Sequence, residues 1–271
     1  MRRLLRLDDW TLDDADAVFA LARAYERGAG PVLGGAAAMF FPPTSLRTRA
    51  SFERGAVLAG MQPIVFPPET LDKEEAPRDV AAYLAQFVDV LVVRHPDIAL
   101  LEALAAAAAV PVVNAMTSEN HPCEVLADLY ALTGGTDVGA LRVRFVGADG
   151  NIARAWAEAS RLFGFDLVQC CPSALATAGL AWTDDLRAAV ADADVVVTDG
   201  PGPHAGALAP FRVTAEVLSW APTGVRFAPC PPFVRGRELA ADALSGAAFV
   251  GYAAKRALVP VQQAVLAHCT G

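Results

Sequence analysis

The chain alternates short apolar runs with amphipathic segments from about residue 36 to residue 230, and this pattern constrains its fold more than any other feature. Continuous apolar runs such as 90–93 and 195–198 are typical of strands buried on both faces of a parallel sheet. Turns containing Gly or Pro separate these runs from segments with helical periodicity. The alternation therefore predicts an α/β fold in which helices connect parallel strands.

Eight strands and eight helices follow from this pattern. The predicted strands are 36–41, 63–66, 90–93, 110–113, 141–146, 167–170, 195–198 and 226–228. The predicted helices are 12–27, 50–59, 79–87, 100–108, 122–132, 151–163, 186–191 and 261–268, with Thr11 as a plausible N-cap of the first. The pattern is interrupted at 133–137 (Thr-Gly-Gly-Thr-Asp) and then restarts. Because 271 residues can bury two cores, we expect two α/β halves joined by the predicted helix 122–132.

The composition narrows the class of protein. Apolar residues make up 54% of the chain and charged residues 19%, which describes a compact globular protein rather than a disordered one. The net charge of −8 argues against nucleic acid or an acidic membrane as partner, because both would require a basic face. No apolar run reaches transmembrane length, and the charged start lacks a signal-peptide pattern. The five cysteines show no metal-binding spacing, so we expect a cytoplasmic protein without a metal.

A short polar turn, Ser45-Leu46-Arg47-Thr48-Arg49, precedes the predicted helix 50–59. A helix start exposes backbone N–H groups and the positive end of the helix dipole, which suits a phosphate group. The guanidinium groups of Arg47 and Arg49 add charged donors that fit phosphate oxygens. Together with the later His121-Pro122-Cys123-Glu124, this turn indicates an enzyme that handles a small acyl phosphate.

Polar side chains follow several of the predicted strands. In parallel α/β folds, ligands bind at the carboxyl ends of the strands, where loops converge. The residues found at such positions are Arg94, Asn114, His121, Asn151, Asp199 and Cys230. This coincidence indicates a ligand site more strongly than any single motif does.

These segments resemble motifs of the aspartate/ornithine carbamoyltransferase family, and are closer to its ornithine branch. Residues 45–53 resemble the family's Ser-Thr-Arg-Thr-Arg carbamoyl-phosphate loop and the helix behind it. Residues 92–94 resemble a strand that ends in another phosphate-binding arginine, and 121–128 resemble its His-Pro-Cys-Gln-Ala-Leu-Ala-Asp segment. Residues 227–232 resemble the ornithine branch's His-Cys-Leu-Pro, and Lys255-Arg256 resembles its closing Glu-Asn-Arg. The likeness keeps a consistent order over most of the chain.

The resemblance implies a carbamoyltransferase that moves the carbamoyl group of carbamoyl phosphate to an amine. It implies direct attack without a metal, a cofactor or a covalent intermediate, in a cytoplasmic homotrimer. It also implies two parallel-sheet α/β domains. The first, at 1–128, binds carbamoyl phosphate and is completed by a C-terminal helix at 256–271 that packs back on it. The second, at 129–255, is Rossmann-like and binds the amine acceptor.

The resemblance also assigns the site residues. The expected ligands of carbamoyl phosphate are Ser45, Leu46, Arg47, Thr48, Arg49, Arg94, His121, Glu124 and Arg256. The expected ligands of the acceptor are Asn151, Asp199, Cys230 and Pro231. Catalytic roles are expected for Arg94, His121, Cys230 and Arg256, of which His121 and Arg256 would polarise the carbamoyl oxygen.

Three departures from the family fall in the first domain. Leu46 stands where the family has Thr, which removes a hydroxyl but keeps the backbone N–H. Glu124 stands where it has Gln; a carboxylate can also accept from the carbamoyl NH₂ group, but its burial beside phosphate is unfavourable. Glu124 is therefore protonated, paired or turned away. The loop 69–73 has Glu-Thr where the ornithine branch has Ser-Gln, so it either completes a neighbouring subunit's pocket or is an exposed acidic loop.

The residues expected to bind the acceptor differ further from the family's motifs. Residues 200–204 read Gly-Pro-Gly-Pro-His where the ornithine branch has a Ser-Met-Gly turn, and proline cannot donate a backbone N–H. We therefore expect an acceptor that is ornithine-like or another small diamino compound, such as a diaminopropionate-like group in a specialised-metabolite pathway. Two other classes stay open. One is a catalytically silent or regulatory binding protein on the same fold. The other is a dinucleotide-dependent enzyme, suggested by the turn 147–151, which lacks Gly-x-Gly-x-x-Gly spacing.

Overall fold

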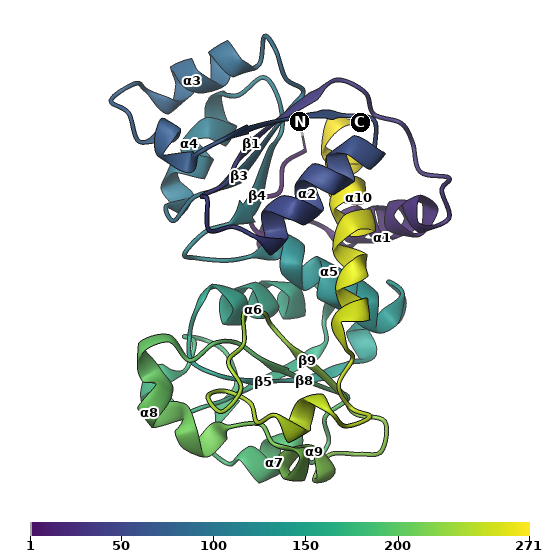
Figure 1. Ribbon diagram of the computed structural model, residues 1–271, viewed down its shortest axis with the longest axis vertical. Helices are drawn as coiled ribbons and strands as arrows, with labels where there is room; N and C mark the ends of the chain where they lie inside the picture. The colour runs from purple at the N-terminus through teal and green to yellow at the C-terminus, as the bar shows by residue number, and fades with distance from the viewer. Residues whose placement is uncertain (1) are drawn as a thin grey trace. The chain divides into compact units, whose positions relative to one another are not determined.

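The computed structural model describes residues 2–271, which form two compact units (Figure 1). Among the described residues, unit 1 comprises 2–136 and 256–271, and unit 2 comprises 137–255. The sequence prediction set the boundary at 128/129, which lies inside helix α5 (Pro122–Thr133). All of α5 belongs to unit 1, because the helix is buried from Pro122 to Tyr130 and packs against the C-terminal helix of the same unit.

Unit 1 is built on a four-stranded parallel sheet in the order β2-β1-β3-β4. Its strands are β1 (Ala36–Phe40), β2 (Gln62–Phe66), β3 (Val90–Arg94) and β4 (Val112–Met116). The four apolar residues of β3 are fully buried, as expected for a central parallel strand. The chain passes from β1 outward to β2 and then continues with β3 on the other side of β1. A topological switch point therefore lies between β1 and β3, and ligands bind at such points in open α/β sheets.

The helices of unit 1 cover both faces of this sheet (Figure 1). Helices α3 (Pro77–Leu84) and α4 (Ile98–Ala107) lie on one side, and α1 (Leu12–Glu26), α2 (Arg47–Leu58) and α10 (Leu258–Thr270) lie on the other. Helix α10 packs against α1, α2 and α5, which confirms that the C-terminal helix returns to the first domain. Thr11 caps α1 as predicted, because its hydroxyl accepts from the Asp14 N–H at 3.3 Å and Asp14 accepts in return.

Unit 2 contains a five-stranded parallel sheet in the order β7-β6-β5-β8-β9. Its strands are β5 (Arg142–Val146), β6 (Asp166–Cys170), β7 (Trp182–Thr183), β8 (Val195–Thr198) and β9 (Arg226–Pro229). Its helices are α6 (Asn151–Phe163), α7 (Leu186–Val190), α8 (Ala205–Leu208) and α9 (Ala215–Ser219). The strand order reverses between β5 and β8, so this sheet also has a switch point. The two parallel-sheet α/β domains expected from the sequence are confirmed.

Two differences from the predicted elements alter the interpretation of site residues. Helix α2 begins at Arg47 rather than at residue 50, so the arginines of the polar turn form the first helical turn. Strand β4 runs over 112–116 instead of 110–113, which places Asn114 inside the strand. The short elements β7, α8 and α9 escaped prediction because two to five residues are too few to show a period.

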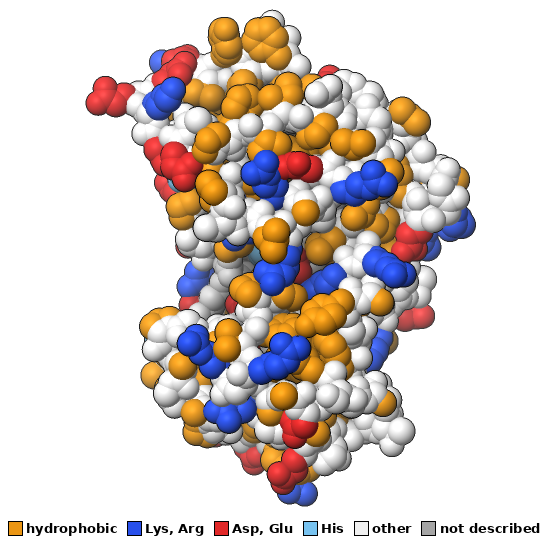
Figure 2. All heavy atoms as spheres, viewed as in Figure 1, with side chains coloured by type: hydrophobic (Ala, Val, Ile, Leu, Met, Phe, Trp, Pro, Cys, Tyr) orange, Lys and Arg blue, Asp and Glu red, His pale blue; other side chains and the backbone are white. Residues whose placement is uncertain are grey.

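Lysine, arginine, acidic and apolar side chains stand beside one another on the surface of each unit (Figure 2). Large apolar side chains exposed on unit 1 include Val32 and Leu46, which are 82% and 73% exposed. Within residues 2–271, no helix is both long enough and apolar enough to cross a membrane.

Candidate active site

Three predicted phosphate ligands, from the segment before α2, from α2 itself and from β3, lie together at the switch point of unit 1. Ser45 and Thr48 are buried, and Arg94 lies at the carboxyl end of the neighbouring strand β3. The Arg94 Nη1 atom donates to Ser45 Oγ at 3.1 Å and to Thr48 Oγ1 at 3.4 Å. Leu46 occupies the N-cap position of α2, and no side chain caps this helix. The helix start therefore presents backbone donors beside a fixed guanidinium, an arrangement that suits a phosphate group.

Arg94 is a half-buried cation whose charge is balanced from within the unit. Burial lowers the pKa of its guanidinium, and the Glu124 carboxylate acts in the opposite direction. An arginine in this setting stays protonated. Its hydrogen bonds to two hydroxyl groups hold it in one orientation before any ligand binds.

The two arginines of the polar turn lie differently. Arg47 is exposed at the first position of α2, where its side chain can reach a ligand at the helix start. Arg49 is partly buried and forms an ion pair with Glu53 one turn later in the same helix. This ion pair holds the Arg49 side chain along α2, and its expected contact with carbamoyl phosphate stays a prediction.

The first turn of α5 holds the second motif. His121 stands at the N-cap position, and Pro122 follows it as the first helical residue. His121 and Glu124 are both buried, and His121 Nε2 lies 3.9 Å from Glu124 Oε2. An imidazole and a carboxylate thus share one buried helix start.

A buried amide network that the sequence analysis missed fixes the segment before His121. Asn114 Nδ2 donates to Asn120 Oδ1 at 2.6 Å and to the Leu5 carbonyl at 2.9 Å. Asn120 Nδ2 also donates to the Leu5 carbonyl, and the backbone N–H of Asn120 donates to Thr117 Oγ1. The network joins β4, the loop after it and the N-terminal segment. Its only signal in the sequence is Asn114 at a strand end, because Asn120 has no motif of its own.

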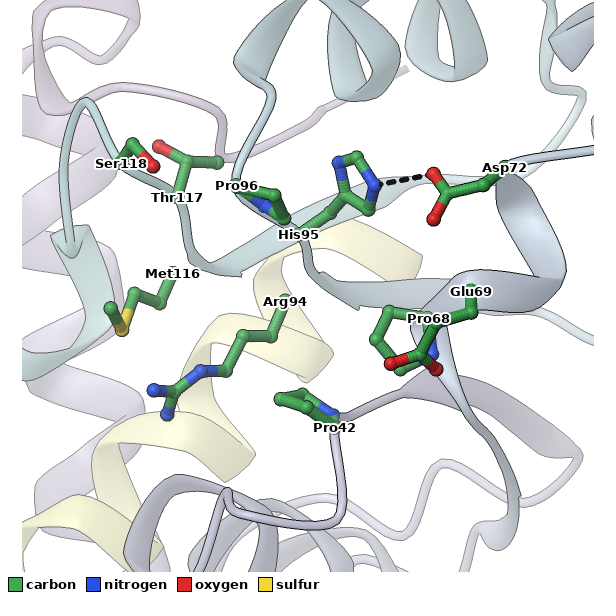
Figure 3. Close-up of a pocket in the computed structure, with 10 residues that line it drawn as sticks. All are labelled: Pro42, Pro68, Glu69, Asp72, Arg94, His95, Pro96, Met116, Thr117 and Ser118. Atoms are coloured by element: carbon green, nitrogen blue, oxygen red, sulfur yellow. Dashed lines mark hydrogen bonds and ion pairs between the residues drawn. The ribbon is translucent and has the colours of Figure 1, made fainter.

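A cavity of about 300 Å³ opens beside Arg94 (Figure 3). The Arg94 side chain extends between Met116 and Pro42, and an Asp72–His95 pair lies across the cavity. His95 Nδ1 accepts from the Asp97 N–H at 3.1 Å, so the proton is on Nε2, which lies 2.8 Å from Asp72 Oδ1. Glu69 and Asp72 thus line a cavity of their own unit; whether this loop also reaches a neighbouring subunit stays a prediction.

The predicted acceptor residues gather at the switch point of unit 2. Asn151 is the first residue of α6, Asp199 directly follows β8, and Cys230 directly follows β9. The Cys230 N–H donates to the Thr198 carbonyl at 2.8 Å, and Asp199 Oδ1 accepts from the Gly200 N–H at 2.8 Å. These residues therefore lie at neighbouring strand ends, as the sequence predicted. Pro231 is partly exposed immediately beyond them.

The loop after Asp199 is short and stiff. Residues 201–204 form a turn in which the His204 N–H donates to the Pro201 carbonyl at 2.9 Å, and α8 follows directly. Gly202 has a φ of 51°, a left-handed conformation that glycine adopts without strain. Two of the five residues in 200–204 are prolines and offer no backbone N–H to a ligand.

An ion pair at the start of α6 was also missed by the sequence analysis. Asp149 accepts from Arg154 Nε at 3.0 Å and from Thr177 Oγ1 at 3.0 Å. Burial raises the pKa of Asp149, but these hydrogen bonds outweigh it and the pKa is lowered. The carboxylate closes the turn 147–151 against α6, so this turn has a structural role in addition to presenting Asn151.

Arg256 lies outside both clusters in sequence. It is exposed near the end of a short 3₁₀ helix (Tyr252–Ala257) and begins the C-terminal part of unit 1. Its contact with the carbamoyl oxygen stays a prediction. Among residues 2–271, no group of three or more His, Cys, Asp or Glu side chains is arranged to hold a metal ion.

Comparison with known proteins covers nearly the whole chain. Residues 2–133 match the family model described as "Aspartate/ornithine carbamoyltransferase, carbamoyl-P binding domain". Residues 140–269 match the one described as "Aspartate/ornithine carbamoyltransferase, Asp/Orn binding domain". The ornithine carbamoyltransferase of Nitrobacter winogradskyi is 31% identical over 264 residues, which cover 89% of this chain and 86% of that protein. That of Sorangium cellulosum is 34% identical over 280 residues, covering 90% of each.

Solved structures give the same result. Ornithine carbamoyltransferase from Pyrococcus furiosus superposes with a TM-score of 0.92 at 27% identity, covering 100% of this chain and 97% of that one. The enzyme from Burkholderia thailandensis superposes with a TM-score of 0.90 at 28% identity, covering 99% and 98%.

Proposed function

This chain belongs to the aspartate/ornithine carbamoyltransferase family and is a carbamoyltransferase, and we propose that it transfers the carbamoyl group of carbamoyl phosphate to a primary amine of an ornithine-like or other small diamino compound. The observation that carries the donor half is the contact of Arg94 with Ser45 and Thr48 at the start of α2. The acceptor half rests on Asn151, Asp199 and Cys230 at the switch point of unit 2.

In the donor half, phosphate oxygens would accept from Arg94, from Arg47 and from the first N–H groups of α2. The hydroxyl groups of Ser45 and Thr48, which now accept from Arg94, would donate to phosphate in turn. The exposed side chain of Leu46 contributes no hydrogen bond, but its backbone N–H lies at the same helix start. We expect carbamoyl phosphate bound at this place to direct its carbamoyl group toward the first turn of α5.

In the reaction, a neutral amine attacks the carbamoyl carbon, negative charge develops on the carbamoyl oxygen, and phosphate leaves. We expect His121 and Arg256 to donate to that oxygen, where preorganised donors stabilise the transition state most. The residues that fix both reactants contribute by proximity, which removes entropic cost from a two-substrate step. No covalent intermediate is required.

In the acceptor half, the Asp199 carboxylate favours a cationic or zwitterionic amine. Cys230 is 5% exposed beside it, at the position expected to face the reacting amine. The proline-containing loop 200–204 supplies fewer backbone donors than the Ser-Met-Gly turn of the ornithine branch. This difference supports a small diamino acceptor other than ornithine as the second candidate substrate within the same activity.

The test is a screen of amines with carbamoyl phosphate. Phosphate release and product mass would be measured for ornithine, for shorter diamino acids and for simple diamines. We expect one class to give a product heavier by one carbamoyl group. If no amine supports turnover although a non-hydrolysable donor analogue binds, the chain is a binding protein on this fold. If the analogue does not bind either, the assignment of the donor site is wrong.

We also expect a cytoplasmic homotrimer. The exposed large apolar side chains of unit 1 support an assembly, because a neighbouring subunit could cover them. Those with the largest exposure are Leu12, Val32, Leu46, Val57, Leu58, Tyr83 and Phe87. Light scattering on the purified protein gives the mass directly, and a monomeric mass would contradict the expectation.

A further inference from the structure

We propose that Glu124 is a charged partner that keeps His121 protonated, so that an imidazolium rather than a neutral imidazole donates to the carbamoyl oxygen. This inference rests on the proposed function of the donor site. It selects one of the three states that the sequence left open for Glu124, namely the paired one.

The geometry of α5 brings the two side chains together. His121 is the N-cap of α5 and Glu124 is its third helical residue, and the side chains at these two positions meet at the first turn of a helix. Pro122, between them in sequence, fixes the first helical backbone angle and so limits the freedom of the turn. The 3.9 Å separation of His121 Nε2 and Glu124 Oε2 is an ion-pair distance.

Burial strengthens the attraction between His121 and Glu124. The side chains of His121 and Glu124 are 7% and 10% exposed, so little water screens the charges. The attraction between opposite charges at about 4 Å is several times stronger in such surroundings than in bulk water. A carboxylate beside an imidazole favours the protonated imidazole.

Other ionisable groups lie on β3 and on α5 itself. Arg94 on β3 interacts electrostatically with Glu124, and a cation beside a carboxylate favours its ionised form but opposes a second cation at His121. On α5 itself, Asp128 is a further acidic residue, one turn beyond Glu124. The Cys123 thiol is fully buried, and burial raises its pKa far above neutrality, so it carries no charge.

Among the elements packed against α5, α1 brings charges to its C-terminal half, where Glu26 accepts from the Tyr130 hydroxyl and Arg23 and Arg27 lie near it. β4 contains no ionisable side chain. On α10, burial raises the pKa of Cys269 to about 12, and His268 is bonded to Asp14 on α1. Arg256, which the proposed function also places at the carbamoyl oxygen, opposes a second positive charge there, as Arg94 does. Within this proposal, the Glu124 carboxylate outweighs these two cations at His121. A phosphate dianion bound at Arg94 would further favour the protonated form of His121.

The Gln found at this position in the family's motif cannot have this effect, because an amide carries no charge. The decisive variant is therefore Glu124→Gln, which preserves the shape of the side chain. Without the carboxylate, His121 loses its proton at lower pH. The alkaline limb of kcat/KM for carbamoyl phosphate should move down by about one pH unit, which makes the variant about tenfold slower on that limb.

Two further variants show whether charge is the cause. Glu124→Asp keeps the carboxylate and should keep the alkaline limb close to that of the wild type. Glu102→Gln removes a half-exposed carboxylate from α4 of the same unit, where it pairs with Arg6, and should leave the pH profile unchanged. If Glu124→Gln and the wild type share one pH profile, the proposal is overturned.

A direct titration keeps the proposal testable without turnover. The chain has four histidines, so the ring resonance of His121 can be identified by its loss in His121→Gln. In the wild type, we expect its titration midpoint above the ordinary value of about 6.5 despite burial. A midpoint at or below that value overturns the proposal even if Glu124→Gln does not fold.

The proposed function and the His121–Glu124 pair can be contradicted separately. If phosphonoacetamide, in which a methylene group replaces the bridging oxygen of carbamoyl phosphate, does not bind the wild type in calorimetry, the proposed function is wrong. The titration of His121 still decides whether the pair exists. If the analogue binds but the midpoint of His121 is the same in Glu124→Gln, only the present inference fails.

Discussion

The two units arrange their switch points differently. In unit 1, the side chains of Ser45, Thr48 and Arg94 already contact one another, and both hydroxyl groups are buried. In unit 2, Asp199 is partly exposed, and its carboxylate accepts from the N–H of the next residue, Gly200. A rigid set of donors suits a ligand of fixed shape such as a phosphate group. In unit 2 we propose that selectivity depends on the adjoining loop, because loops are the parts that vary most between relatives.

The donor site is better defined than the acceptor site. Phosphate recognition needs a helix start and a guanidinium, and both come from regular elements anchored in the sheet of unit 1. We propose that acceptor recognition depends on residues 200–204, where two prolines offer no backbone donors. The four predictions below test this contrast, first in function and then in stability.

The largest effect is expected for Arg47→Ala, which removes an exposed charged donor from the first turn of α2. We expect kcat/KM for carbamoyl phosphate to fall by about 100-fold or more, because a lost transition-state donor costs about 3 kcal/mol. Arg54→Ala, an exposed arginine on the same helix, serves as control and should retain activity. A fall within about threefold for Arg47→Ala, roughly 0.7 kcal/mol, would show that the phosphate does not bind there.

The next prediction concerns binding of the amine acceptor in unit 2. Asp199→Asn removes the carboxylate expected to attract the amine, so KM for the amine should rise about tenfold or more, or roughly 1.4 kcal/mol. The affinity for phosphonoacetamide, measured by calorimetry, should stay unchanged because that ligand binds in unit 1. Asp184→Asn, an exposed site in unit 2, is the matched control. Weaker binding of the donor analogue by Asp199→Asn would contradict the assignment of donor binding to unit 1 and of acceptor binding to unit 2.

A smaller effect concerns the stability of unit 2. Arg144 is 4% exposed on β5, and its Nη2 atom lies 2.8 Å from carboxylate oxygens of both Asp166 and Asp192. Asp192→Asn leaves the buried guanidinium with fewer partners, and we expect a loss of about 1–2 kcal/mol in the free energy of unfolding. The loss is modest because Asp166 and the Ala189 carbonyl remain. Denaturant titration measures it, and no change relative to Asp184→Asn would show that Arg144 is solvated.

The smallest effect concerns the stability of unit 1 and its pH dependence. His268 on α10 bonds to Asp14 on α1 at 2.9 Å, and burial lowers the pKa of His268 below its ordinary value. The unfolded chain therefore binds a proton at higher pH than the folded one. Stability from this group is complete above about pH 6.5 and is lost as the pH falls through the lowered pKa.

His268→Gln should remove this dependence. We expect the Tm of the wild type to fall by about 2–4 °C more than that of His268→Gln between pH 7 and pH 5, if the coupling is worth about 1 kcal/mol. Differential scanning calorimetry at both pH values measures the difference. Parallel curves for the two proteins would contradict the assignment.

Much of the fold and part of the site follow from local sequence. Strands such as β3 and β8 have continuous apolar runs, and Arg94 and Asp199 come at or directly after their ends. Such positions are readable because strand ends meet at one edge of a parallel sheet. Boundaries were less predictable: the start of α2 at Arg47 lacks a capping side chain, because Leu46 stands where Ser, Thr, Asp or Asn would signal it.

Other features could not be predicted because their partners are distant in sequence. The bond between Asp14 and His268 spans 254 positions, and Asn120 contacts Leu5 across 115. No periodicity or short motif joins such residues. The exposure of Arg256 and the cavity beside Arg94 likewise depend on how complete elements pack.

The chain path of unit 1 has a consequence for synthesis. Unit 2 is one continuous stretch, 137–255, inserted between two parts of unit 1. The ribosome therefore delivers all of unit 2 before α10, the helix that buries the inner faces of α1, α2 and α5. Domains usually fold in the order in which they emerge. Here the inserted unit can finish first, while unit 1 keeps an apolar face uncovered and open to chaperones until the last helix arrives.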